Sequence, residues 1–237
     1  MDKKSEFQSF WGKVGSILKV LRKKRDRREY FSALFDSKIL LLRNKTVLFV
    51  DGGANLGQGF GWFSSFYCGP KVTFHLFEPN PHCYETLLEL TRDPAKDVKL
   101  FEAGISTSEG EVKFFGLSDS EGGKLSQGGS ILADHNSAWY TASENDAITV
   151  RVVDFEKYLH EQSKFFDKIA VKMDIEGAEV DLLERLIETG SAAKISVLYV
   201  EFHSQFQTPT QRVQTRAREE KIVRDLKGLG VKVRIWH

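Results

Sequence analysis

The stretch that decides the fold is Val47–Phe63, "VLFVDGGANLGQGFGWF", in which an apolar run leads directly into an aspartate and a series of glycines. This order is typical of a β-strand that ends in a tight turn and continues into a helix. Neither common phosphate-binding pattern is present, because the stretch contains no GxxxxGK(S/T) and no GxGxxG. The pattern is instead Asp51, Gly53, Asn55 and Gly57, spaced two apart.

The acid at the strand end restricts the ligand that this turn can hold. A carboxylate at Asp51 repels a pyrophosphate, whereas it suits a ligand with a positively charged end. S-adenosylmethionine has such an end in its amino-acid tail, and glycines allow the backbone to approach it closely. We therefore predict an S-adenosylmethionine site in which Asp51 organises the ammonium group directly or through water.

A second acid follows at a suitable distance along the chain. The segment "HLFEPNP" places Glu78 at the end of the next predicted strand, 27 residues after Asp51. A carboxylate at this position of a nucleotide-binding βαβ unit accepts hydrogen bonds from the ribose hydroxyls. Together the two acids favour an adenosine-type cofactor over a simple phosphate.

Apolar runs and amphipathic patterns alternate along the rest of the domain. Predicted strands cover residues 45–53, 71–81, 98–106, 111–117, 167–177, 194–203 and 231–237, and residues 147–159 read as a strand that enters a short helix. Predicted helices cover residues 56–68, 82–93, 178–190 and 210–230. Strands that are apolar throughout indicate a parallel sheet covered on both faces. The sequence therefore predicts an α/β fold with a doubly wound, mostly parallel, Rossmann-like sheet in one domain, residues 45–237.

Two segments depart from this alternation. Residues 119–145 are rich in Gly and Ser and predict a long loop that borders the active site. Residues 1–44 carry apolar side chains at helical spacing from Phe7 to Leu21, followed by the basic block Arg22–Arg28. They predict an amphipathic helix and basic segment that packs on or flanks the core, and contact with a membrane surface or nucleic acid stays open.

Composition excludes several classes of protein. The chain has 34 Lys and Arg against 33 Asp and Glu, which gives no global basis for binding nucleic acid. Its two cysteines form no zinc or disulfide pattern, and no apolar run approaches the roughly 20 residues that span a bilayer. The start "MDKKSEFQSFWGK" lacks the apolar segment of a signal peptide. We expect a soluble, cytoplasmic protein.

Charged residues gather at the ends of two later strands. In "KMDIEG", Lys172, Asp174 and Glu176 alternate along an extended strand end and project to one side. In "VEFH", Glu201 and His203 do the same. We predict that these five residues carry the catalysis, with His203 as the general base, because histidine titrates near neutral pH, and Asp174 as the second choice. A divalent cation held by the carboxylates and the imidazole stays open, but no metal is assigned, because acids at strand ends serve a substrate equally well.

The motifs "VDGGANLG", "FEPNP", "KMDIEGAEVDLLERL" and "VEFH" resemble, in order and spacing, those of the FkbM family of S-adenosylmethionine-dependent methyltransferases. The resemblance covers residues 47–203. It implies the seven-stranded class I methyltransferase fold and methyl transfer to a hydroxyl of a sugar, glycan or small natural product. Because residues 231–237 supply one strand, the presence of the seventh strand stays open.

The same resemblance implies which residues bind the cofactor. The turn after the first strand lines the methionine and ribose part, Glu78 takes the ribose hydroxyls with Asn80 beside it, and the segment after the third strand forms the adenine pocket. The complete set is Asp51, Gly52, Gly53, Ala54, Asn55, Gly57, Glu78, Asn80, Glu102, Ala103 and Asp174.

Other functions stay open as alternatives. A methyltransferase of RNA or other nucleic acid is disfavoured, because the chain lacks an NPPY-type tetrapeptide and "KMDIE" does not reproduce a Lys-Asp-Lys-Glu set. A nicotinamide oxidoreductase is disfavoured by Asp51 and Asn55. A non-catalytic protein that binds S-adenosylmethionine or serves as a scaffold is the remaining alternative.

Overall fold

The computed structural model describes residues 24–117, 128–133 and 147–236. The apolar series Phe7–Leu21 and most of the loop predicted at 119–145 lie outside these ranges. No helix within them is both long and apolar enough to cross a membrane.

Six strands form the main sheet, and each is parallel to its neighbours. The chain builds outward from β1 in one direction and then crosses to β7 to build in the other, so the predicted doubly wound α/β sheet is confirmed. Ligands of such sheets bind beyond the carboxyl ends of the strands at this reversal. In spatial order the strands are β3 (Asp97–Phe101), β2 (Val72–Phe77), β1 (Val47–Gly52), β7 (Lys168–Met173), β8 (Val197–Val200) and β9 (Lys232–Ile235).

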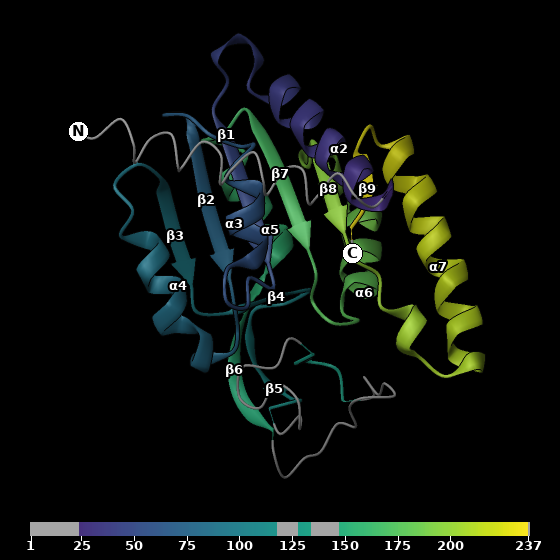
Figure 1. Cartoon of the computed structure of the whole chain (residues 1–237). Coiled ribbons are helices and arrows are strands. Elements are labelled where there is room, and N and C mark those ends of the chain that lie inside the picture. The colour runs from purple at the N-terminus through teal and green to yellow at the C-terminus, as the bar shows by residue number, and fades with distance from the viewer. Residues whose placement is uncertain (1–23, 118–127, 134–146, 237) are drawn as a thin grey trace.

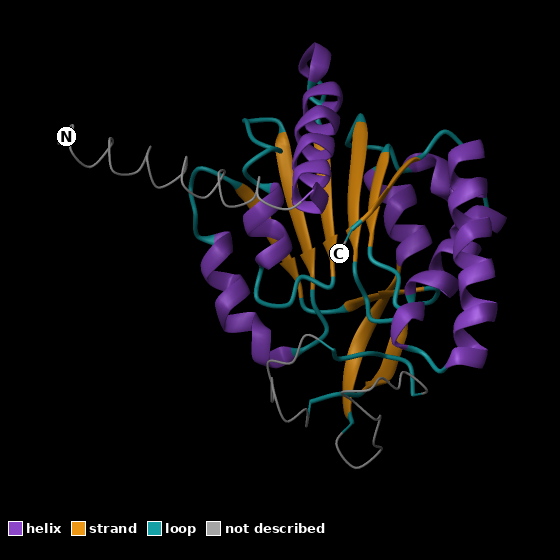
Figure 2. Ribbon diagram, turned by 45° about the vertical axis from the view of Figure 1, so that its right-hand side comes forward, coloured by secondary structure: helices purple, strands orange, loops and turns teal. Residues whose placement is uncertain are grey.

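Helices cover both faces of this sheet (Figure 2). Strand β1 is buried throughout, because its alternate side chains enter two separate cores. Leu48 and Val50 pack in one core, and Val47 and Phe49 pack in the other. The first core includes residues of α5 (Phe155–Gln162), α6 (Glu179–Glu188) and α7 (Pro209–Gly228), and the second includes residues of α2 (Lys24–Leu40), α3 (Gln58–Phe63) and α4 (Tyr84–Thr91).

The helices follow the sequence pattern with shorter ends. The patterns at 82–93, 178–190 and 210–230 correspond to α4, α6 and α7. The helix predicted at 56–68 is reduced to α3, because Gly57 is left-handed, with φ of 86°, and turns follow Phe63. Short 3-10 turns complete the connections: η1 (Leu42–Asn44), η2 (Pro81–Cys83), η5 (Ser191–Lys194) and η6 (Ser204–Phe206).

Helix α2 begins inside the basic block Arg22–Arg28 and continues to Leu40. The sequence pattern had specified a helix only before this block. Its buried Asp36 forms ion pairs of 2.8 Å with Lys232 and Arg234 of β9. The Tyr199 hydroxyl of β8 also donates to Asp36, at 3.3 Å. These contacts fasten α2 to the β8–β9 side of the main sheet (Figure 1).

A second, smaller sheet was not predicted as a separate unit. It consists of β4 (Gly104–Ser106), β6 (Ile148–Asp154) and β5 (Gly110–Phe114), in that order. Strand β4 runs parallel to β6 and β5 runs antiparallel to it, and only residues 107–109 connect β4 to β5. The sequence predicted strands in these segments without assigning them to a sheet of their own. Figure 1 shows the small sheet beyond the carboxyl ends of the main strands.

The main sheet ends at β9, which pairs with β8 in parallel. The residues that the structure describes place no antiparallel strand beside it. The six strands thus lack, within these ranges, the seventh strand whose presence the sequence left open.

Candidate functional site

The turn after β1 has a backbone that depends on glycine. Gly53, Asn55 and Gly57 are all left-handed, with φ of 75°, 46° and 86°. A Cβ on Gly53 would lie 1.9 Å from the backbone oxygen of Asp174, so the turn rests directly on the end of β7. A Cβ on Gly57 would lie 2.4 Å from Leu90 of α4. The turn is therefore closely packed between β7 and α4.

Lys172 connects the ends of β1 and β7. Its ammonium lies 3.2 Å from Asp51 Oδ1 and 3.3 Å from Asp174 Oδ2, and it donates to the Gly53 carbonyl at 2.8 Å. Burial opposes the charge on Lys172, but the two carboxylates outweigh it and hold the pKa of the ammonium above its usual value. The structure places the Asp51 side chain fully out of solvent, beneath the turn. Its Oδ1 faces Lys172, and its predicted role at a ligand's ammonium, directly or through water, stays a prediction.

Two further glycines of the opening stretch differ in their surroundings. A Cβ on Gly59 would lie 2.7 Å from Asp51 Oδ2, so this glycine makes room for the buried carboxylate. Nothing lies within 4 Å of a Cβ on Gly61. The close approach of the Asp51 carboxylate explains why position 59 is a glycine. The described structure gives no reason for a glycine at position 61.

Glu78 lies at the end of β2 and faces the turn after β1. Its oxygens accept hydrogen bonds from the backbone N–H groups of Asn55, at 2.7 Å, and Asn80, at 2.8 Å. Burial raises the pKa of Glu78 to about 7, although both N–H groups act to lower it. A carboxylate has about four acceptor positions, so two remain beyond these N–H groups. The predicted neighbour relation between Glu78 and Asn80 is present.

The remaining predicted cofactor residues lie at or just after the ends of β1 and β3. Ala54 is buried, and its N–H donates to the Phe77 carbonyl of β2 at 3.0 Å. Ala103 is also buried, whereas Glu102 is exposed beside it after β3. Gly52 ends β1, and its carbonyl accepts from the Asp174 N–H at 3.1 Å. Their roles at a cofactor stay predictions.

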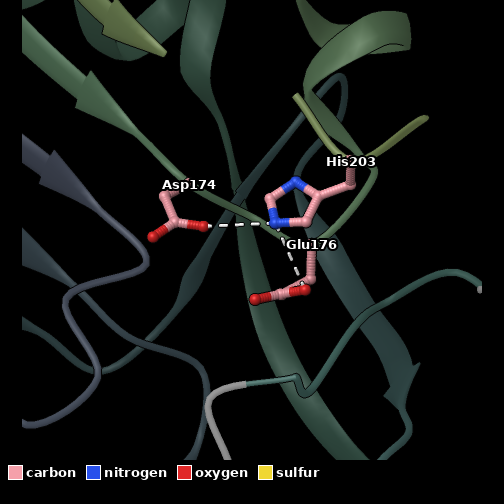
Figure 3. A group of neighbouring side chains, drawn as sticks. All are labelled: Asp174, Glu176 and His203. Carbon is pink, nitrogen blue, oxygen red and sulfur yellow. Dashed lines mark ion pairs between the residues drawn. The ribbon is translucent and has the colours of Figure 1, made fainter. Parts of the chain in front are cut away.

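Three side chains from the ends of β7 and β8 meet at the same edge of the sheet (Figure 3). His203 Nε2 lies 3.5 Å from Asp174 Oδ1 and 3.3 Å from Glu176 Oε2. Its other ring nitrogen, Nδ1, lies 3.0 Å from Glu179 Oε1. The imidazole is thus enclosed by three carboxylates, and both of its nitrogens face one.

This setting bears on the general-base role of His203, which stays a prediction. Burial lowers the pKa of the imidazole, but Glu179 and Glu176 outweigh burial and raise it to about 11. Glu201 lies near the same group, and burial, followed by the charge of Asp174, raises its pKa to about 7.

Glu179 is the residue that the sequence analysis missed. Its fully buried carboxylate accepts from the N–H groups of Ile175, at 2.8 Å, and Gly177, at 3.0 Å, besides facing His203. Glu179 therefore fixes both the loop after β7 and the imidazole. A signal was present in the sequence, because this charged residue shares its helical face with Leu182, Leu183 and Leu186.

The described part of the predicted 119–145 loop reaches the site. Ser130 is buried, pairs with Phe115 of the small sheet region, and donates its hydroxyl to the Glu176 carbonyl at 2.7 Å. Glu176 itself is left-handed, with φ of 55°, which is uncommon outside glycine, Asn and Asp. Ser130 thus lies beside Glu176, and the prediction that the whole loop borders an active site stays a prediction.

The order of the main sheet, the glycine turn after β1 and the acid after β2 define a class I methyltransferase type of fold. The family model for the methyltransferase FkbM domain matches residues 51–221, so the chain belongs to the FkbM methyltransferase family. The family resemblance seen in the sequence motifs is confirmed. Among curated proteins, none matches this sequence.

A solved structure is also similar to this chain. The crystal structure of a methyltransferase FkbM from Methylobacillus flagellatus KT shares 16% sequence identity with it, at a TM-score of 0.43. The match covers 78% of this chain and 41% of that chain. The chain therefore spans less than half the length of that protein.

Proposed function

We propose that this protein is an S-adenosylmethionine-dependent O-methyltransferase that acts on a hydroxyl of a sugar, a glycan or a small hydroxylated natural product. The observation that carries the proposal is the position of Glu78. A buried carboxylate at the end of β2, held by two backbone N–H groups and facing a left-handed glycine turn, fits the two adjacent hydroxyls of a ribose.

The residues around Glu78 fit the rest of an adenosine cofactor. The turn from Gly53 to Gly57 offers backbone with little side-chain bulk, and Ala103 closes the side next to β3. S-adenosylmethionine, when bound, supplies an electrophilic methyl group on a sulfonium. Asp51 supports this site from beneath, because its charge pairs with Lys172 and holds the ends of β1 and β7 together.

The acidic edge formed by Asp174, Glu176 and Glu201 supports an uncharged, hydroxyl-bearing acceptor. Carboxylates accept hydrogen bonds from several hydroxyls, whereas they repel a polyanion such as RNA. Positioning of the acceptor supplies much of the rate of such a transfer. We infer that a carboxylate of this edge, and not His203, takes the hydroxyl proton, because both nitrogens of His203 already face carboxylates.

A methyl-transfer screen tests the proposal. Labelled S-adenosylmethionine is offered with simple sugars, glycans and hydroxylated metabolites, and label on an acceptor oxygen is the expected result. Glu176→Gln should retain binding of S-adenosylhomocysteine and lose turnover on the acceptor found. Binding without turnover on any acceptor class would favour the scaffold alternative, and label on nitrogen or carbon would contradict O-methylation.

A further inference from the structure

Asp174, Glu176 and His203 present one ligand atom each to a common point. These atoms all lie within 4.8 Å of one another. The separations from His203 Nε2 are 3.5 Å to Asp174 Oδ1 and 3.3 Å to Glu176 Oε2. Adjacent ligands of an octahedral ion with bonds of about 2.1 Å lie about 3 Å apart, so the two separations from His203 Nε2 are close to those of such a set.

The imidazole is oriented as a metal ligand usually is. A ligating histidine commonly directs its second nitrogen to a carboxylate, which fixes the ring. Here that partner is Glu179, whose Oε1 lies 3.0 Å from Nδ1. Glu179 is itself fixed by the N–H groups of Ile175 and Gly177. Because this support is buried, His203 Nε2 is directed toward Asp174 and Glu176.

The two carboxylates leave one side of the group open. Their side chains are 26% and 19% exposed, whereas that of His203 is 4% exposed. Asp174 uses its other oxygen, Oδ2, to meet Lys172, so Oδ1 is the oxygen turned to the imidazole. Ser130 holds the Glu176 carbonyl, which fixes the backbone from which that carboxylate projects. An ion bound by these carboxylates would therefore lie within reach of solvent, which can supply further oxygen ligands.

We propose that Asp174, Glu176 and His203 bind a divalent cation of the Mg²⁺ or Mn²⁺ type. Two carboxylates and one imidazole, with room for water, are a suitable set for such hard cations. The sequence analysis assigned no metal, because strand-end acids alone did not require one. What changes the assignment is the convergence of the three side chains with a buried Glu179 behind the histidine.

The proposed ion would lie next to the proposed S-adenosylmethionine site. Asp174 contributes both the backbone oxygen that packs against Gly53 and a carboxylate of the cation set. An ion bound there would coordinate an oxygen of the acceptor and hold the acceptor in a fixed orientation. This last step rests on the proposed function, whereas ion binding does not.

The test is binding of Mn²⁺ to the full chain without cofactor or acceptor. Titration is followed by loss of the electron paramagnetic resonance signal of free Mn²⁺ and by calorimetry, and binding of one ion per chain is expected. Glu176→Gln and Asp174→Asn should each weaken it by about tenfold or more, and Glu179→Gln by about 10–100-fold. The matched control is Glu188→Gln, an exposed acid at the end of α6, which should bind as the parent chain does.

A second measurement does not depend on any variant. Crystals of the parent chain grown with Mn²⁺ should show an anomalous peak between the three side chains. Absence of binding at millimolar Mn²⁺, a peak elsewhere, or unchanged affinity in a folded Glu176→Gln or Asp174→Asn chain would overturn the proposal. Binding of S-adenosylhomocysteine is measured in a separate titration. The cation site and the methyltransferase function can therefore fail independently.

Discussion

The ammonium of Lys172 lies 3.2 Å from Asp51 Oδ1 in the interior of the domain, and neither side chain is more than slightly exposed. The two residues belong to neighbouring parallel strands and are register partners, Asp51 on β1 and Lys172 on β7. The pair therefore neutralises the charge of the acid directly beneath the turn that we assign to the cofactor.

Removal of the lysine should strongly destabilise the protein. Lys172→Met leaves the carboxylate of Asp51 buried without its cation, and breaking a buried pair in this way costs about 3–5 kcal/mol. The free energy of unfolding in urea measures this loss. The control is Lys164→Met, which breaks an exposed pair with Glu161 and should leave the free energy of unfolding nearly unchanged. Equal losses in the two variants would show that the buried pair has no special role.

The glycines of α3 should respond in opposite directions to the same change. Gly59→Ala places a methyl group 2.7 Å from Asp51 Oδ2 and should destabilise the chain by about 1–3 kcal/mol, since overpacking in an interior costs that much. Gly61→Ala meets nothing within 4 Å and should stabilise it by about 0.5–1 kcal/mol, because alanine is the better helix former. Thermal unfolding of both variants checks the sign. A stabilised Gly59→Ala chain would mean that the Asp51 carboxylate lies elsewhere.

Cofactor affinity should depend on pH through Glu78. The pKa of Glu78 is raised to about 7, so its carboxyl gains a proton as the pH falls through 7. Only the ionised form accepts hydrogen bonds from both ribose hydroxyls, so affinity for S-adenosylhomocysteine should fall below pH 7 and level off above it. Glu78→Gln should weaken binding by about 1.5–3 kcal/mol and remove this step, since a hydrogen bond to a charged group contributes about that much. A parent affinity that stays constant from pH 8 to about 5.5, a range that spans the value near 7, would count against the role.

Helix α2 should be needed for stability through Asp36. Asp36→Ala removes the shared partner of Lys232 and Arg234, and a loss of about 2 kcal/mol is expected, below that of a fully buried pair because both cations are partly exposed. Asp181→Ala, which removes an exposed partner of Arg218, should cost below about 1 kcal/mol. If chemical denaturation shows the same midpoint for Asp36→Ala and the parent chain, α2 is not anchored as described.

The main sheet could be predicted from the sequence because its strands are apolar on both faces. Phe49 and Val171 lie in strands that are buried along almost their whole length and contain apolar runs, which is the pattern of a parallel sheet between helices. The small sheet could not be separated in this way. Strands β5 and β6 alternate in burial like many half-exposed strands, and nothing in a single strand's pattern says which sheet it joins.

The position of the candidate site could be predicted from the sequence, whereas the surroundings of His203 could not. Glu78 and Asp174 lie at the strand ends where the sequence placed them, since the topology of a doubly wound sheet fixes that edge. The role of His203 depends on Glu179, which reaches it from the first turn of α6. That contact arises from tertiary packing between α6 and the segment after β8, so strand alternation alone could not indicate it.

The most direct test of the account is calorimetric titration of the full chain with S-adenosylhomocysteine at pH 8, beside the Glu78→Gln variant and beside NAD. The account predicts binding of one S-adenosylhomocysteine per chain, clear weakening in Glu78→Gln and no binding of NAD. Absence of S-adenosylhomocysteine binding to the folded parent chain would contradict the central claim that the turn after β1 and Glu78 form a methyl-donor site.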